Sequence, residues 1–409
     1  MAWHTPISKL FIKEPEVTKL KRRRYAGAAL SRLTEGWVTG NTSADAEIKT
    51  SLKKLRDRSR QLCRDNPYAK QAKRTTQINV IGQGIKLQCN VPSIRGKKKD
   101  KRLSMMIEKA WREWCKRDYC DVSGQKSFFM LENMMVGALV ESGEVFFRIV
   151  RRKFGRSKVG LALEIIESDL VDDDYTGKVL RKGNEWRMGI EVDKFGRPQR
   201  YAFLNRHPGD YFFKDNYTEQ KHTIVNASDI IHLFLPERPA QNRGVPFFSS
   251  IMDDMHQLSG YESAAVIRAR AGASLMGFIS SSEGELEADD VEAEQRLTDF
   301  EAGVFKYLNP GEEITVPNIS SPDAQYESFV RAKIRRFASG LGVSYETISR
   351  DFSETNYSSS RLSLLEDREH WKMLQTYFVE NFHQRVFEEF LDAAVLSGVL
   401  NLPDYELSP

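Results

Sequence analysis

Residues 341–361 have the sequence LGVSYETISRDFSETNYSSSR and separate two stretches of helical periodicity. In the first stretch, 321–341, apolar residues recur every three or four positions, which predicts an amphipathic helix. Gly340 and Gly342 mark its end, because glycine readily adopts the left-handed conformation that closes many helices. The second stretch starts at an N-capping serine, 359 or 360, and continues to Gly398. We therefore expect a helix, a loop and then a helix roughly 50–60 Å long.

A third amphipathic stretch, 246–276, comes earlier in the chain and carries small residues near its end. Between it and 321–341 lies the segment 277–320, with strand-like pieces at 278–279, 304–308 and 314–316 around a short helix at 288–300. The two long helices run in opposite directions if their ends lie close together. The pattern predicts an antiparallel helix pair capped by a small α/β unit.

The segment before residue 246 contains both helical and strand patterns. Helices are predicted over 43–72, broken at Asn66-Pro67, and over 105–116 and 127–142. Strands are predicted at 75–87, 145–150, 161–166, 190–192, 201–203 and 230–234, separated by glycine, aspartate, asparagine and proline. Runs of helices followed by runs of strands predict an α+β fold.

The composition excludes several classes of protein. In 409 residues no apolar run approaches the ~18–20 residues of a membrane span, and the N-terminus lacks a secretory signal pattern. Four cysteines are too few for a disulfide framework, and Cys115 and Cys120 lack the spacing of a zinc site. Asp172-Asp-Asp174 is interpreted as a polar turn rather than a Mg²⁺ or Ca²⁺ site. With no phosphate-binding motif and no clustered catalytic carboxylates, we expect no enzyme, cofactor or metal.

The net charge is only +4, but the charges are unevenly distributed. Basic residues cluster at 19–24, 53–60 and 95–102, whereas 283–313 is strongly acidic. Such blocks are often no more than solvated faces. The change of sign along the chain nevertheless indicates different neighbours for different regions.

Short motifs along the chain carry a resemblance to a known family. Around the loop they are Leu341-Gly-Val-Ser-Tyr-Glu346, Asp351-Phe-Ser353 and Asn356-Tyr-Ser-Ser-Ser-Arg361. Elsewhere, in order, they are Asp65-Asn-Pro-Tyr-Ala69, Asn79-Val-Ile-Gly-Gln-Gly-Ile85, Glu141-Ser-Gly-Glu-Val-Phe146, Glu167-Ser-Asp169, Gly189-Ile-Glu-Val-Asp193, Gly196-Arg-Pro198, His207-Pro-Gly-Asp210, Ser228-Asp-Ile-Ile-His-Leu-Phe234, Pro236-Glu-Arg-Pro239 and Arg243-Gly-Val-Pro246. Together, from Tyr25 to Pro403, they resemble the portal proteins of tailed bacteriophages, in particular the lambda-like family.

The resemblance implies an α+β portal fold with long stem helices, a mixed α/β wing and a small α/β clip, assembled as a ring. By the same resemblance the chain divides into an N-terminal basic arm (1–24), a wing (25–245), a first stem helix (246–276), a clip (277–320), a second stem helix (321–341), a tunnel-loop region (342–358), a long wing helix (359–398) and the start of a crown or a truncated C-terminus (399–409). Relatives usually continue into a crown, so we expect that domain to be truncated or absent, unless this is only part of a longer chain.

The family forms a dodecameric ring at one capsid vertex, so the resemblance implies a homo-oligomeric channel for DNA packaging and ejection. The implied partners are double-stranded DNA, the terminase large subunit, the major capsid protein and head–tail adaptor or tail proteins, with no membrane. The implied location is the virion, at the capsid vertex, after assembly in the host cytoplasm. The alternatives are a monomeric DNA-binding or capsid scaffolding protein of the same pathway, or a packaging nuclease or ATPase. The missing motifs argue against the last two.

Three sets of residues are candidates for function in such a ring. The tunnel-loop set suits a flexible element beside a duplex, and equally any surface loop: Asp351, Phe352, Ser353, Glu354, Thr355, Asn356, Tyr357 and Ser358. The stem set fits scattered phosphate contacts or, alternatively, ion pairs with acids of the next subunit: Arg331, Lys333, Arg335 and Arg336. The clip set fits a negative collar for partners with basic patches: Glu283, Glu285, Glu287, Asp289 and Asp290.

Overall fold

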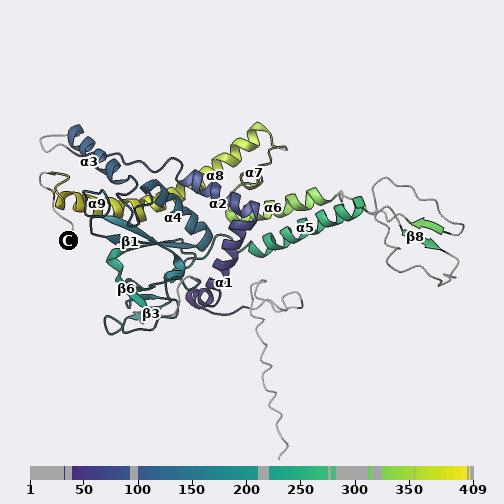
Figure 1. The fold of residues 1–409 in the computed structure, drawn as a ribbon, viewed down its shortest axis with the longest axis horizontal. Helices are drawn as coiled ribbons and strands as arrows, with labels where there is room; N and C mark the ends of the chain where they lie inside the picture. The colour runs from purple at the N-terminus through teal and green to yellow at the C-terminus, as the bar shows by residue number, and fades with distance from the viewer. Residues whose placement is uncertain are drawn as a thin grey trace, which may run out of the picture. The chain divides into compact units, whose positions relative to one another are not determined.

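The computed structural model describes residues 32, 39–92, 100–210, 221–274, 278–281, 312–315, 325–353, 355–402 and 405. The chain forms two units, Met1–Thr42 and Ser43–Pro409, and the helices and strands named below belong to the second. Its elements are helices and antiparallel strands, which confirms the predicted α+β class (Figure 1). None of the helices described is both long enough and apolar enough to cross a bilayer.

The helices of the N-terminal half are α1 (Ala44–Asp65), α2 (Pro67–Val80), α3 (Lys101–Trp114) and α4 (Phe128–Ser142). Each begins after a side chain that accepts a backbone N–H of the first turn: Ser43, Asn66, Asp100 and Ser127. Gly143 closes α4 in the left-handed region, at a φ of 83°, as its position in the sequence predicts. The three predicted helical stretches are therefore confirmed, including the break at Asn66-Pro67.

The predicted strand at 75–87 is wrong. Residues up to Val80 complete α2, and Gly82 and Gly84 then turn the chain at φ values of 57° and 94°. The β-branched residues of this stretch favour a strand. The Asn66 cap with Pro67 behind it starts a helix instead, and packing of α2 against α4 sustains it.

Two antiparallel sheets follow. The first has the order β2-β1-β7, from β1 (Glu144–Val150), β2 (Ala162–Ile166) and β7 (Ile230–Phe234). The second has the order β3-β4-β5-β6, from β3 (Glu185–Arg187), β4 (Ile190–Val192), β5 (Pro198–Leu204) and β6 (His222–Asn226). Two 3₁₀ turns accompany them, η3 (Ser168–Leu170) and η4 (Ala227–Asp229). The predicted strands among these are confirmed, whereas β3 and β6 escaped prediction because they are short and largely polar.

The long C-terminal helix comprises α8 (Tyr357–Phe378), a π-helical turn (Val379–His383) and α9 (Gln384–Leu396). It starts two residues earlier than the predicted Ser359. Buried residues recur at every fourth position from Leu374 to Ala394. In a regular α-helix this spacing rotates the buried face by about 40° per step. The wider π turn offsets part of that rotation and keeps α8 and α9 on the same core.

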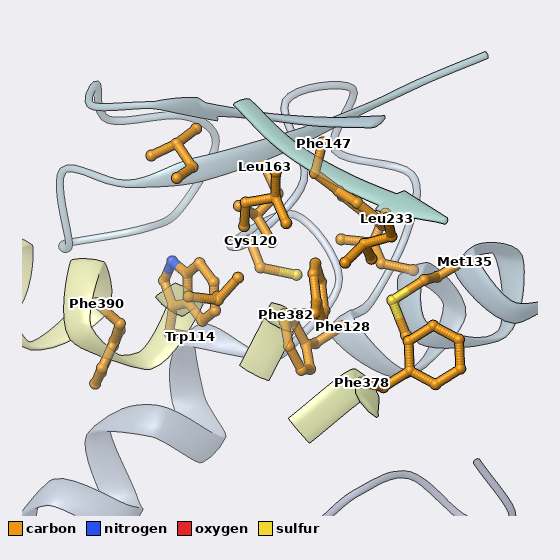
Figure 2. Close-up of a cluster of buried hydrophobic side chains, with 14 of the residues drawn as sticks. Trp114, Cys120, Phe128, Met135, Phe147, Leu163, Leu233, Phe378, Phe382 and Phe390 are labelled. Atoms are coloured by element: carbon orange, nitrogen blue, oxygen red, sulfur yellow. The ribbon is translucent and has the colours of Figure 1, made fainter. Parts of the chain in front are cut away.

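β1 is buried on both faces because its alternate side chains enter different cores. Phe147 belongs to the main core, between the first sheet and the helices α3, α4, α8 and α9, whereas Phe146 packs edge-on against Tyr201 and Phe203 of the second sheet. Figure 2 shows the main core, where side chains of the helices meet side chains of the first sheet: Trp114, Cys120, Phe128, Met135, Phe147, Leu163, Leu233, Phe378, Phe382 and Phe390.

The remaining elements are α5 (Met252–Ser274), β8 (Phe278–Ser281), β9 (Glu312–Thr315), α6 (Tyr326–Leu341) and α7 (Tyr345–Ser349). β8 pairs with β9, in agreement with the strand pieces predicted at 278–279 and 314–316, while the pieces at 288–300 and 304–308 lie outside the described residues. α5 starts six residues later than predicted. Residues 246–251 form consecutive turns instead, with Ser249 donating to the carbonyl of Pro246 and Ile251 to that of Phe248.

Candidate channel-lining site

α5 and α6 run antiparallel and side by side, as the sequence predicts (Figure 1). The ring of Tyr261 lies 5.9 Å from that of Tyr326 and 4.8 Å from that of Phe329. At the other end, a Cβ on Gly340 would come within 2.4 Å of Ile251 Cγ2, so glycine allows the close approach. Both helices share a buried core with α1 and α2, which fixes where the pair leaves the body.

The four stem cations all have partners within their own chain. Lys333 Nζ and Arg336 Nε each lie 2.9 Å from a carboxylate oxygen of Asp254 on α5. The hydrogen bond from Lys333 and the charge of Arg336 lower the pKa of Asp254. Arg331 pairs with Glu327 at 2.7 Å and lies 3.8 Å from Asp351, and Arg335 lies over the ring of Tyr345. The sequence indicates DNA or acids of the next subunit as neighbours of these cations. The partners found in the structure belong to the same chain instead.

The first half of the tunnel-loop region is anchored. Residues 344–349 contain α7, which the sequence pattern did not predict, and its N-cap residue, Ser344, is held by Asp367 of α8. The Asp367 carboxylate accepts hydrogen bonds from Ser344 N at 2.9 Å, Ser344 Oγ at 2.8 Å and Thr347 Oγ1 at 2.6 Å. Only 5% of Asp367 is exposed, so these are buried charge-assisted bonds. The flexible element expected from the sequence, 351–358, comes after this anchored half.

The second half of the region presents its side chains to solvent. Asp351 starts it, accepting hydrogen bonds from Ser353 and from the hydroxyl of Tyr345, and the bonds from Ser353 contribute most to lowering its pKa. Phe352 and Tyr357 are 56% and 82% exposed. Tyr357 and Ser358 already belong to α8. Ser353, Asn356 and Ser358 are exposed, Thr355 is half-buried, and Glu354 lies outside the described residues.

The clip set lies outside the described residues, which contain only the β8–β9 ribbon of that segment. Glu283, Glu285, Glu287, Asp289 and Asp290 therefore remain candidates from sequence alone. In the ribbon, Ile279 pairs with Ile314 and Ser281 with Glu312.

A buried charge cluster joins the two sheets, α1 and the segment that leads to α5. Glu144 receives hydrogen bonds from Arg56 and Arg243, with Arg243 Nη2 at 2.7 Å, and lies 3.0 Å from His232 Nε2. Burial alone would raise the pKa of Glu144, but the charges of Arg243 and Arg56 outweigh it and hold the pKa well below its usual range. Arg243 also contacts Asp173 and the carbonyl of Met188. The cluster therefore ties α1 and both sheets to the segment that leads to α5.

One group of potential metal ligands occurs among the described residues: Glu167, Asp169 and His207, whose ligand atoms lie within 4.8 Å of one another. Arg60 contacts both carboxylates, at 3.4 Å from Glu167, so a guanidinium already provides the positive charge. Asp172, Asp173 and Asp174 contact His222, Arg243 and Lys49 respectively. These contacts agree with a polar turn.

The comparison with known families covers most of the chain. The family model for "Phage portal protein, lambda family" matches residues 30–375. The chain belongs to the lambda family of phage portal proteins. This lambda-family chain is 31% identical to a probable portal protein of Halomonas phage phiHAP-1, over 96% of its own length and 75% of that relative. It is 24% identical to portal protein B of Escherichia phage lambda, over 93% of its own length and 77% of the relative.

Among solved structures, the portal chain is similar in fold to a chain from the neck of an empty gene transfer agent particle computed with C6 symmetry. The TM-score is 0.51 at 13% identity, covering 88% of this chain and 86% of that one. The relatives from phages phiHAP-1 and lambda are both named as portal proteins and not as enzymes, in agreement with the structural role of the family.

Proposed function

We propose that this portal protein forms a twelve-membered ring at one vertex of the phage capsid, through which double-stranded DNA is packaged and ejected. The observation that carries the proposal is the family match over residues 30–375. The similar fold of a chain from a cyclically symmetric neck supports a ring. The protein would then be a component of the virion, assembled in the host cytoplasm and seated against the major capsid protein.

Exposed apolar side chains on the two stem helices support assembly with further copies. On α5, Tyr261, Val266 and Ile267 are 37%, 49% and 65% exposed, and on α6 Phe329 is 41% exposed. Exposed apolar side chains gathered on one pair of helices are typical of protein interfaces. A ring buries such faces between neighbouring copies.

The charges of the stem support a channel that does not hold DNA tightly. Each phosphate that a protein neutralises adds salt-dependent affinity, and that affinity would slow the passage of a duplex. Pairing of Lys333 and Arg336 with the single carboxylate of Asp254 reduces the net charge that these two cations offer to phosphate. Phe352 and Tyr357 would present aromatic side chains to the channel, and they carry no charge.

The acidic clip is proposed as the docking surface for the terminase large subunit and, later, for head–tail adaptor or tail proteins. Charge reversal at Glu285, Glu287 and Asp290 should weaken that docking at least tenfold while rings still form. Docking measured by co-sedimentation that is unchanged by the reversal would remove the clip from the proposal.

Electron microscopy of the purified protein tests the ring, with mass photometry for the number of copies. We expect closed rings with an axial opening wide enough for duplex DNA. Single copies that bind DNA without a ring would instead support a monomeric DNA-binding or scaffolding role. ATPase or nuclease activity in the same preparation would contradict a structural role.

A further inference from the structure

A groove of about 380 Å³ lies between α3, the connection from β1 to β2 and the segment that follows α9. These three parts are far apart in the sequence, and hydrogen bonds hold them together. Trp114 Nε1 donates to the carbonyl of Leu161 at 3.0 Å, and the backbone N–H of Gly160 donates to Ser397 Oγ at 3.0 Å. We call this site the α3 groove. Its walls are tied to one another within a single chain.

Part of the lining of the α3 groove is apolar. The residues concerned are Met106, Ala110, Trp114, Val159, Val399 and Leu400. Met106 is 37% exposed, whereas Trp114 and Leu400 are buried. A methionine side chain is flexible and polarisable, so it adapts to apolar side chains of different shapes. The groove therefore offers apolar contact area to a partner.

The rest of the lining is mainly cationic. Three cations line the groove with one acid: Lys109, Arg156, Lys158 and Glu113. The two segments that carry them, 109–119 and 152–159, contain four lysines and arginines each but only two acids in total. Both acids already form ion pairs with cations of these same segments. Eight cations and two acids leave an excess of six positive charges around the groove.

An apolar groove with excess positive charge fits a protein helix better than it fits DNA. The phosphates of a duplex would meet the cations, but a duplex has no apolar side chain to place against Met106, Trp114 and Val399. Amphipathic helices bind in such grooves through apolar anchors three or four residues apart. Acidic residues beside those anchors would complement the charge of the site.

We propose that the α3 groove binds an acidic amphipathic helix of another protein. The apolar anchors of that helix occupy the groove, and its carboxylates lie against Lys109, Arg156 and Lys158. The site is separate from the stem, because α3 packs in the main core whereas α5 and α6 share another core with α1 and α2. This inference goes beyond the proposed function, and it does not depend on the ring or on the number of copies.

A designed peptide tests the chemistry of the α3 groove. Its sequence of about 20 residues forms a helix with leucine at every third or fourth position and glutamate on both sides of that stripe. One control peptide has lysine in place of glutamate, and another has serine in place of leucine. In fluorescence anisotropy with the full chain, the acidic leucine peptide should bind at least tenfold more tightly than either control. Equal binding of either control peptide would overturn the proposal.

Charge reversal in the chain locates the peptide. Lys109→Glu with Lys158→Glu should weaken binding of the acidic leucine peptide at least tenfold, and Met106→Ser should weaken it at least threefold. Both lysines are exposed, so the folded structure should be retained. The matched control is Lys178→Glu with Lys194→Glu, which are exposed lysines outside the groove, and it should bind like the unsubstituted chain. The same loss in both double variants would contradict binding at this site.

Duplex DNA is the competing ligand in the same assay. A duplex that displaces the peptide at about 0.15 M salt, and that loses its own affinity in Lys109→Glu with Lys158→Glu, would assign the cations to DNA and overturn the proposal. Mass photometry of the same samples reports ring formation separately. A chain that forms no ring but binds the acidic leucine peptide in the α3 groove would overturn the proposed function and support this inference.

Discussion

At the scale of single residues, Glu144 is a charged side chain that is almost completely buried. It is 1% exposed, and its charge is balanced by Arg56 and Arg243, which are 1% and 0% exposed. Removing one member of such a buried cluster leaves the others charged without compensation, which costs more than the cluster contributes as a whole.

Glu144→Gln should therefore lower the free energy of unfolding by about 3–5 kcal/mol. Urea unfolding of the single chain measures it. Glu164→Gln is the control, since its side chain is 42% exposed and lies 3.7 Å from Arg148, where the expected loss is about 0–1 kcal/mol. Equal losses in the two variants would show that burial of the cluster is not what matters.

The same residue predicts a dependence of stability on pH. Because the folded-state pKa of Glu144 lies below its ordinary value of 4.5, its contribution is complete above that pH and is lost as the pH falls further. Burial likewise lowers the pKa of His232 from 6.5, so its contribution is lost as the pH falls below 6.5. The free energy of unfolding should decline on acidification from pH 7, and less steeply below 4.5 in Glu144→Gln. Parallel curves for the two proteins would contradict the assignment.

One feature of the sequence does indicate this buried charge cluster. Arg56 belongs to the basic run 53–60, which was interpreted only as a charge block. Its position places it on the same helical face as Ile48, Leu52 and Cys63, all of which are buried. A cation on an apolar stripe indicates a buried partner. The identity of that partner, 88 residues away, depends on the fold and could not be predicted from local pattern.

At the scale of elements, α7 should depend on the hydrogen bonds that Ser344 and Thr347 donate to Asp367 of α8. Asp367→Ala removes the acceptor of three hydrogen bonds and should cost about 1–2 kcal/mol. Hydrogen exchange should become at least tenfold faster in 344–349 and stay unchanged in α9. The control is Glu369→Ala, two residues further, whose side chain is 73% exposed. Unchanged exchange in Asp367→Ala would mean that packing, not capping, holds α7.

Elements with a strong period were predictable, and those defined by a tertiary contact were not. The helices α1, α3, α4 and α6 and the strand β1 follow from their apolar patterns. The strand predicted at 75–87 is wrong because the Asn66 cap starts a helix that continues through the β-branched residues to Val80. α7 is five residues long and is anchored by Asp367, 20 positions from Thr347, so no local pattern predicts it. Conversely, the repeat of four from Leu374 to Ala394 indicates a widened turn, and the prediction of one regular helix overlooked it.

At the scale of the whole molecule, the pairing of the stem cations should set how the ring holds DNA. Asp254→Asn releases Lys333 and Arg336, so the logarithm of DNA affinity should fall more steeply with the logarithm of salt concentration, by about 1–2 units for each chain that the duplex touches. Asp253→Asn is the control, because the hydrogen bond to that carboxylate comes from Gln257 and not from Lys333 or Arg336. Mass photometry should first confirm intact rings of both variants. Identical salt slopes would indicate that these cations do not face DNA.

The candidate site was predictable as a list of positions but not as an arrangement. The antiparallel helix pair and the connection between α6 and α8 occur where the sequence pattern predicts them. That Asp254 and Asp351 would lie close to three of the four stem cations depended on how α5, α6 and α7 pack, which periodicity does not encode. How copies assemble could not be predicted from the sequence either, since only the folded chain shows which apolar side chains are exposed.

The π turn at 379–383 has a mechanical meaning. A single regular helix would transmit a force on its N-terminal end directly to the sheet, whereas a helix with a widened turn at its middle bends there. In the proposed ring, a push from packed DNA on the start of α8 should thus be absorbed beside Phe382, and α9 with the strands should keep its place. Spin-label distances across 379–383 that are equal in empty and filled heads would contradict this. The long helix therefore acts as two segments, α8 and α9, joined by a bend at the π turn.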